Sequence, residues 1–210
     1  MEDHFDSFTQ NRYDVMRELL LAIPDLHEKI VLDLGAGNNA ISSGMPCGLQ
    51  VMLDILPITQ PSVICYFTSN LPCAGHSVDV VIAGEILEHI TESRHFVREI
   101  RRVLSNGGWL ILSVPNIVSL KYRVAFLLGK IPAMAAKADY TYAKEAVTNP
   151  RGHVRDYSFT EVRRVLFDQG FHVTTERSIG LHVGGKRVIP SWMMPITFSD
   201  NVVVKAVLQK

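Results

Sequence analysis

The feature that most constrains the fold is a series of short, β-rich apolar runs, several of them separated by segments with helical periodicity. Uninterrupted apolar runs predict buried parallel strands, and four of them lie at residues 30–37, 49–55, 78–84 and 109–114. Runs in which apolar and polar residues alternate predict edge or antiparallel strands, and they lie at 171–178 and 201–209.

Three segments have the pattern of surface helices: 9–23, 91–104 and 158–170. Asn106, Gly107 and Gly108 are expected to end the second of these helices. Strands separated by helices imply right-handed βαβ units, and therefore an α/β fold with an open, mostly parallel sheet covered on both faces. In such sheets ligands bind at the carboxyl ends of the strands.

The connection after the second strand is short and contains proline. Pro57 and Pro61 fall within the 16 residues between Asp54 and Leu71, and proline interrupts helices. We therefore expect a shortened helix there and a thinly covered face of the sheet. A loop, or a second subunit in a homodimer, would cover that face.

Length and composition favour a single domain, residues 1–210, in the reducing cytoplasm. The chain has 21 Lys and Arg against 21 Asp and Glu, so binding of nucleic acid through bulk charge is not expected. The three cysteines form no C-x-x-C pair, and no apolar run reaches the roughly 18 residues of a membrane span. These features argue against a disulfide framework, a zinc knuckle and a transmembrane segment.

The glycine turn after the first strand points to a nucleotide-type cofactor. Gly35-Ala36-Gly37 opens a G-x-G-x-x-[GA] pattern, and Asp54 lies 19 residues beyond Gly35, as in dinucleotide-binding proteins. Asp33, however, places a carboxylate two residues before the first glycine. Like charges repel, so this carboxylate disfavours a pyrophosphate and favours a sulfonium or ammonium group.

These residues, in register, resemble the class I S-adenosylmethionine (SAM) dependent methyltransferases. The resemblance covers roughly residues 10–210 and is carried by four blocks: 31–37, the acidic strand end at Asp54, 77–90 and 98–116. It implies a Rossmann-like, seven-stranded sheet with an antiparallel C-terminal strand. Within the superfamily the chain is most similar to small-molecule and glycan-tailoring enzymes with methyltransferase domains of types 11 and 23.

The resemblance also implies roles in cofactor binding. Asp33 would orient the methionine amino group, Gly35 and Gly37 would let the backbone approach the cofactor, and Asp54 would accept hydrogen bonds from the ribose hydroxyls. Ile55 would pack on the adenine, Leu71 would lie at the adenine wall, and the Gly84 carbonyl would face the methionine. The acidic residue common before Leu71 is absent, so adenine recognition is expected to fall to Asn70, Ser69 or backbone groups.

A cluster after the third apolar run suggests the chemistry. Glu85, Glu88 and His89 have the spacing to share one face of a short helix. His89 and His153 are the candidates for the catalytic base, because imidazole titrates near neutral pH. Glu85, Glu88 and His89 also resemble the metal motif of small-RNA 2′-O-methyltransferases, which suggests Mg²⁺ or Mn²⁺. The favoured expectation is that no metal is bound.

Two segments are expected to select the acceptor: an N-terminal helical lid over 1–28 and a substrate-lid insertion over 116–150. The apolar stretch 118–136 fits a lid helix packed on the core, a cap over an apolar acceptor or an amphipathic helix in peripheral contact with a membrane. The first is favoured. The arginines of the second helix are expected on its solvent face, where they form no stacking platform for RNA: Arg94, Arg98, Arg101 and Arg102.

The sequence therefore predicts transfer of a methyl group from SAM to a small-molecule or glycan-type acceptor, with oxygen as the expected target atom. One alternative is a metal-dependent 2′-O-methyltransferase acting on RNA ends, which the neutral charge disfavours. A second is a non-catalytic protein with a SAM-binding fold, and a third is an oxidoreductase that binds a nicotinamide dinucleotide.

Overall fold

The structure, a computed structural model, describes the chain except for residues 1–11, 38–39, 56–60, 68, 132–152, 184–185 and 210. Part of the expected N-terminal lid and most of the expected substrate-lid insertion lie outside the described residues. No helix in the described part of the chain is long and apolar enough to cross a bilayer.

A seven-stranded sheet forms the centre of the molecule, with the strand order β3-β2-β1-β4-β5-β9-β6. Neighbouring strands pair in parallel except β9, which runs antiparallel to both β5 and β6. The strands are β1 (Ile30–Leu34), β2 (Leu49–Asp54), β3 (Val63–Ile64), β4 (Val78–Gly84), β5 (Leu104–Pro115), β6 (Phe171–Ser178) and β9 (Asn201–Leu208). The predicted mostly parallel sheet with an antiparallel C-terminal strand is confirmed.

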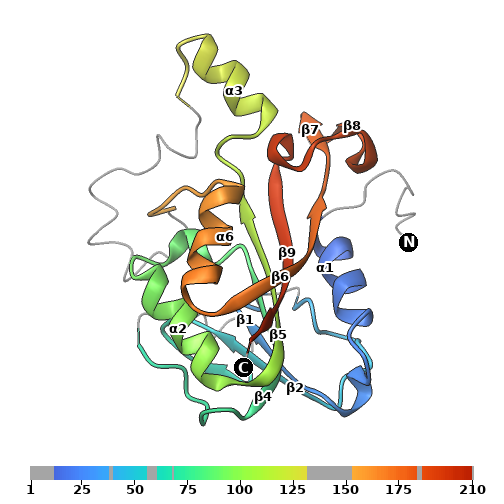
Figure 1. Cartoon of the computed structure of the whole chain (residues 1–210), viewed down its shortest axis with the longest axis vertical. Helices are drawn as coiled ribbons and strands as arrows, with labels where there is room; N and C mark the ends of the chain where they lie inside the picture. Colours follow the sequence, from blue (N-terminus) through green and yellow to red (C-terminus); the bar gives the residue numbers. More distant parts are fainter. Residues whose placement is uncertain are drawn as a thin grey trace.

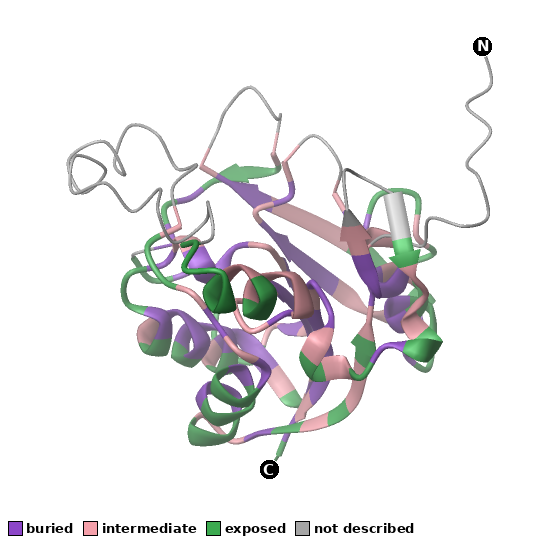
Figure 2. Ribbon diagram, turned by 90° about the horizontal axis from the view of Figure 1, so that it is seen from above, coloured by how far each residue is buried: buried purple, intermediate pink, exposed green. Residues whose placement is uncertain are grey.

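Helices cover both faces of this sheet (Figure 1). On one face α1 (Arg12–Leu21) contributes four buried apolar side chains, and on the other α2 (Ser93–Val103) and α6 (Phe159–Asp168) pack side by side over a larger core. The helix α6 begins with a capping box, in which the side chains of Ser158 and Glu161 each bond the other residue's backbone amide. The strands are buried along much of their length, while exposed residues lie on the outer faces of the helices (Figure 2).

The connections near β2 contain less helix than a regular βαβ succession requires. The described residues between β1 and β2 form turns with no helix, and no helix was predicted there. At the end of this connection a Cβ at Gly48 would lie 2.9 Å from the His27 carbonyl oxygen, so the backbone there passes too close to residues 27–28 for a side chain. After β2, residues 56–60 lie outside the description, and the remaining residues before β3 contain no helix.

The prediction that Asn106, Gly107 and Gly108 end α2 is also wrong. The helix ends at Val103, and β5 begins at Leu104, whose side chain is fully buried. The two glycines lie within β5 where its register with β4 shifts, and Gly107 has a φ of 78°. The glycines therefore lie at an irregularity within a strand. The strand begins directly after the helix because Leu104 is buried in the sheet.

Short elements gather at the carboxyl ends of the parallel strands. They are α3 (Leu120–Leu127), the hairpin of β7 (Leu181–Val183) and β8 (Lys186–Ile189), and the 3₁₀ turns η3 (Leu87–His89), η4 (Ser191–Met193) and η5 (Ile196–Phe198). A further 3₁₀ turn, η1 (Leu26–Glu28), precedes β1. The helix α3 projects away from the sheet and has no buried residue, and Leu127 is 86% exposed. The favoured expectation of a lid helix packed on the core is therefore wrong for its described part (Figure 1).

Candidate active site

A cavity of about 140 Å³ opens at the carboxyl ends of β1 and β4. The strand order reverses at β1, so this is the switch point where open α/β sheets bind ligands. Four predicted cofactor residues line the cavity together with four others: Asp33, Gly35, Gly37 and Gly84, and Tyr13, Leu34, Ala36 and Ile41. Tyr13 comes from α1, so the N-terminal helix contributes directly to the site.

The glycine turn has a backbone conformation that favours glycine. Gly35 and Gly37 have φ values of 66° and 54°. The Gly35 amide donates to the Leu53 carbonyl at 2.8 Å, and a Cβ at Gly35 would lie 2.9 Å from the Ile86 side chain. A Cβ at Gly37, by contrast, would meet no atom of the described residues closer than 3.9 Å. The turn is therefore close-packed on its inner side and open at Gly37.

Asp54, at the end of β2, fixes this turn. Its carboxylate accepts a hydrogen bond from the Gly37 amide at 2.7 Å, and the residue is 6% exposed. A charged acceptor at this distance makes a strong hydrogen bond. The conformation of the glycine turn thus depends on the residue that was predicted to bind the ribose.

Asp33 lines the cavity and is 1% exposed. Its carboxylate accepts the Ser42 amide at 2.9 Å, and burial raises its pKa while hydrogen bonds to Ser42 and Ile41 and the Arg17 charge oppose that rise. The carboxylate therefore joins the wall of the cavity to the turn over residues 40–43.

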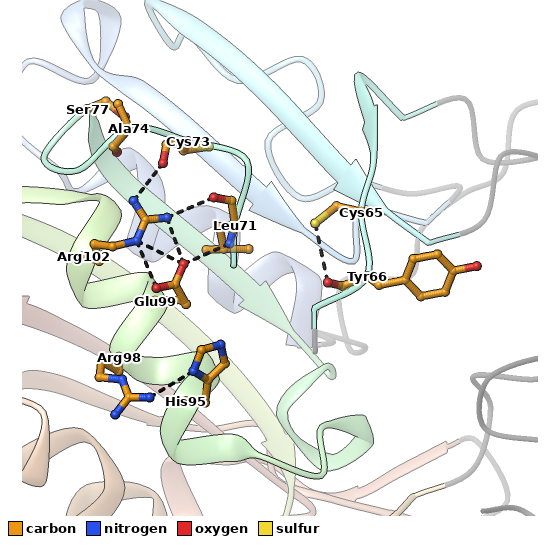
Figure 3. A network of polar contacts seen from close by, with 10 residues as sticks. All are labelled: Cys65, Tyr66, Leu71, Cys73, Ala74, Ser77, His95, Arg98, Glu99 and Arg102. Carbon is orange, nitrogen blue, oxygen red and sulfur yellow. Dashed lines mark hydrogen bonds and ion pairs between the residues drawn. The ribbon is translucent and has the colours of Figure 1, made fainter. Parts of the chain in front are cut away.

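The residues predicted to hold the adenine lie outside the lining of this cavity. Asn70 is exposed, whereas Ile55 packs partly on the core and Leu71 is buried within it. The Leu71 amide donates to Glu99 at 3.0 Å, and the Leu71 carbonyl accepts from Arg102 at 2.9 Å. The structure therefore brings Leu71 into a polar network with α2 (Figure 3).

The expectation that the arginines of α2 lie on its solvent face is wrong for Arg102. Instead of facing solvent alone, its guanidinium bonds the Glu99 carboxylate at 2.8 Å and the Cys73 carbonyl at 2.9 Å (Figure 3). The hydrogen bond from Arg102 lowers the pKa of Glu99 below its ordinary value. Arg102 therefore holds the 71–73 loop against the helix.

The spacing predicted that Glu85 shares a helical face with Glu88 and His89, and this prediction is wrong. Glu85 has a left-handed backbone with a φ of 55°, and the 3₁₀ turn begins only at Leu87. Its carboxylate accepts hydrogen bonds from Ser113 at 2.9 Å and from Asn201 at 2.9 and 3.0 Å. Arg12 lies 3.9 Å away, so Glu85 belongs to a network that joins α1, β4, β5 and β9.

The two predicted catalytic histidines come together although they are 64 positions apart in the chain. The ring centroids of His89 and His153 are 4.9 Å apart and the rings are nearly perpendicular. Glu88 completes a group in which one ligand-type atom of each residue lies within 4.8 Å of the others. Burial, together with the charge of Glu85, raises the pKa of Glu88 well above its ordinary value.

Sequence reasoning missed three residues of the site: Tyr13, Ser113 and Asn201. Tyr13 stood at a helical spacing typical of core residues, and Ser113 lay inside an apolar strand run. Asn201 begins β9 directly opposite Pro115, at the carboxyl end of β5. An antiparallel last strand places its first residue among the carboxyl ends of its neighbours, which is the signal that would have identified Asn201.

Comparison with known proteins agrees with this geometry. Residues 32–112 match a family model described as a methyltransferase domain. A probable SAM-dependent methyltransferase of Mycobacterium tuberculosis is 32% identical over 103 residues, which are 49% of this chain. The chain covers only 30% of the length of that relative.

Two solved structures are similar in fold. A SAM-dependent methyltransferase of Thermotoga maritima, described as a possible histamine N-methyltransferase, has a TM-score of 0.63 at 14% identity, covering 94% of this chain and 89% of that one. The magnesium protoporphyrin IX methyltransferase of Synechocystis, with bound S-adenosylhomocysteine (SAH), has a TM-score of 0.62 at 17% identity, covering 94% and 82%. The chain therefore contains a segment that matches a methyltransferase domain, and its fold is similar to that of solved SAM-dependent methyltransferases.

Proposed function

We propose that this chain transfers a methyl group from SAM to an oxygen atom of a small-molecule acceptor, glycan-type acceptors included. The observation that carries the proposal is the cavity at the switch point of the sheet, where Asp33, the glycine turn and Gly84 meet. The methyltransferase-domain match covers this same part of the chain.

The chemistry of the cavity fits the methionine end of SAM. Asp33 supplies a carboxylate at the wall, and a cationic group beside a carboxylate is stabilised by charge. Gly37 leaves open space where a side chain would stand, so a ligand can approach the backbone. Asp54 lies behind the turn, at the end of the neighbouring strand, and is the residue that we assign to the ribose hydroxyls.

We assign acceptor activation to His89 and His153. SAM, when bound, supplies an electrophilic methyl group on a sulfonium. The chain then has to position the acceptor oxygen in line with that methyl and take up the hydroxyl proton. An imidazole suits the second task near neutral pH. His89 follows the end of β4, whose Gly84 lines the cavity, and the ring of His153 packs against that of His89.

The acceptor would enter from the side where α3 and the β7–β8 hairpin project (Figure 1). The equal numbers of acidic and basic residues disfavour an RNA substrate, since an RNA grip needs local cationic excess. The cysteines Cys47, Cys65 and Cys73 are all free thiols, in keeping with a reducing compartment such as the cytoplasm.

A labelled donor tests the proposal. The protein is incubated with SAM carrying a trideuterated methyl group and a metabolite library, and products are sought by mass spectrometry as pairs that shift with the label. We expect a labelled product, lost without protein. His153→Ala should lower turnover at least tenfold while SAH affinity changes less than threefold. Binding of SAH without transfer to any acceptor would instead favour a non-catalytic SAM-binding protein.

A further inference from the structure

Glu88, His89 and His153 form a compact group, and the first two follow closely in the chain on Gly84, which lines the cavity. One ligand-type atom from each lies within 4.8 Å of the other two. The group joins two distant segments, because the amides of Val154 and Arg155 donate to the Glu88 carbonyl at 2.9 and 3.2 Å. These bonds fix the 153–155 segment against η3 and hold the two histidines together.

The Glu88 carboxyl group is the unusual member. The residue is 1% exposed, and neither carboxyl oxygen has a hydrogen-bond partner among the described residues. His89 Nε2 lies 3.9 Å from Oε1, beyond hydrogen-bond distance. A buried carboxyl group without a hydrogen bond is costly whether it is ionised or protonated, since the protonated form would still bury an unbonded O–H. A ligand that carries positive charge would remove this cost.

We propose that Glu88, His89 and His153 bind one divalent transition-metal ion, Zn²⁺ or Mn²⁺. Two imidazoles and one carboxylate are a recurring ligand set for such ions and leave coordination positions open for water or substrate. In a tetrahedral site with ligands at roughly 2.0–2.2 Å the ligand atoms stand about 3.4 Å apart. The observed spacing of up to 4.8 Å is wider, so binding of the ion would require the side chains to move closer together.

Glu85 is not a ligand in this proposal. Its carboxylate already accepts hydrogen bonds from Ser113 and Asn201, and Arg12 lies next to it. The ion therefore lies on the side of Glu88 and His153. His89 keeps part of its side chain exposed, at 24%, which leaves the group an open side for an incoming ligand.

The role of the ion rests on the proposed function, whereas its binding does not. An ion beside the methyl donor would coordinate oxygens of the acceptor and lower the pKa of its hydroxyl. The acceptor O–C bond then forms as the S–C bond of the donor breaks, SAH leaves, and the hydroxyl proton passes to water. With the ion bound, the two imidazoles are ligands and the ion takes over the activation assigned to them above.

Calorimetric titration of the chelator-treated full chain with ZnCl₂, and separately with MnCl₂, tests the site. We expect one equivalent of at least one of the two ions to bind with a micromolar or lower Kd. Glu88→Gln and His153→Asn should each raise that Kd at least tenfold. His27→Asn is the matched control and should leave the Kd unchanged. His27 and Glu28 form an exposed pair 3.5 Å apart, and the described residues offer this pair no third ligand.

The same samples are titrated with SAH, and circular dichroism confirms their folding. Retained SAH binding in the variants, with metal binding lost, supports the site. Absence of stoichiometric binding of either ion to the wild type overturns it, and so does a Kd that neither Glu88→Gln nor His153→Asn alters. Failure of the wild type to bind SAH would count against the proposed function. It would not affect the metal site, which the titrations with ZnCl₂ and MnCl₂ test independently.

Discussion

Replacement of Asp54 by alanine separates cofactor binding from folding. The carboxylate accepts the Gly37 amide at 2.7 Å, and we assign the ribose hydroxyls to it as well. Hydrogen bonds to a charged group contribute about 1.5–3 kcal/mol, so loss of the ribose contacts should weaken SAH binding by about 10- to 150-fold. Loss of the Gly37 contact should lower the free energy of unfolding by a similar amount. Isothermal titration with SAH and thermal unfolding measure the two effects.

Asp79 provides a matched control at the other end of the sheet. Its carboxylate accepts the Ile30 amide at 3.0 Å, between the amino ends of β4 and β1. Asp79→Ala should therefore destabilise the fold and leave SAH affinity unchanged. An SAH analogue without ribose hydroxyls should lose less affinity than SAH on Asp54→Ala, since only the Gly37 contact is then removed. The ribose assignment would be refuted if Asp54→Ala and Asp79→Ala bound SAH with the same affinity, whether that affinity equalled the wild-type value or fell below it.

Three further substitutions test other parts of the site and fold. Gly37→Val places a β-branched residue at a φ of 54° and fills the open space, so SAH binding should fall more than 100-fold and stability by about 1–2 kcal/mol, measured by calorimetry and thermal melts. Glu99→Gln should cost about 1.5–3 kcal/mol at neutral pH. Because Arg102 lowers the pKa of Glu99 from 4.5, ionised Glu99 stabilises the fold above that value, and the difference in Tm should shrink as the pH falls below it. Ser158→Ala removes the cap of α6 and should lower stability by about 1 kcal/mol, or Tm by about 2–4 °C, without a change in SAH affinity; an unchanged Tm would refute the cap's role.

Local patterns predicted most of the sheet. The strands β1, β2, β4, β6 and β9 lie where apolar runs or alternation placed them, because strand formation follows burial of one or both faces. The two-residue β3 gave no such signal, since both its residues are exposed. The prediction that the glycines within 106–108 end α2 failed because glycine is favoured both at the end of a helix and in a strand bulge.

The site was predictable only where it follows strand ends. Asp33, Gly35, Gly37 and Gly84 meet in one cavity because parallel strands align their carboxyl ends. The contact of Glu85 with Asn201, 116 positions along the chain, follows from the antiparallel β9, but which side chains meet there depends on tertiary packing that the local pattern does not show. The exposure of α3 could not be predicted from the sequence, because an apolar helix has the same sequence pattern whether or not a partner covers it.

A crystal structure of the protein with SAH tests the central claim most directly. We predict SAH with its methionine end in the cavity between Asp33, Gly37 and Gly84 and its ribose within hydrogen-bond distance of Asp54. A cavity that stays empty at saturating SAH, or that takes up a nicotinamide dinucleotide in its place, would contradict it.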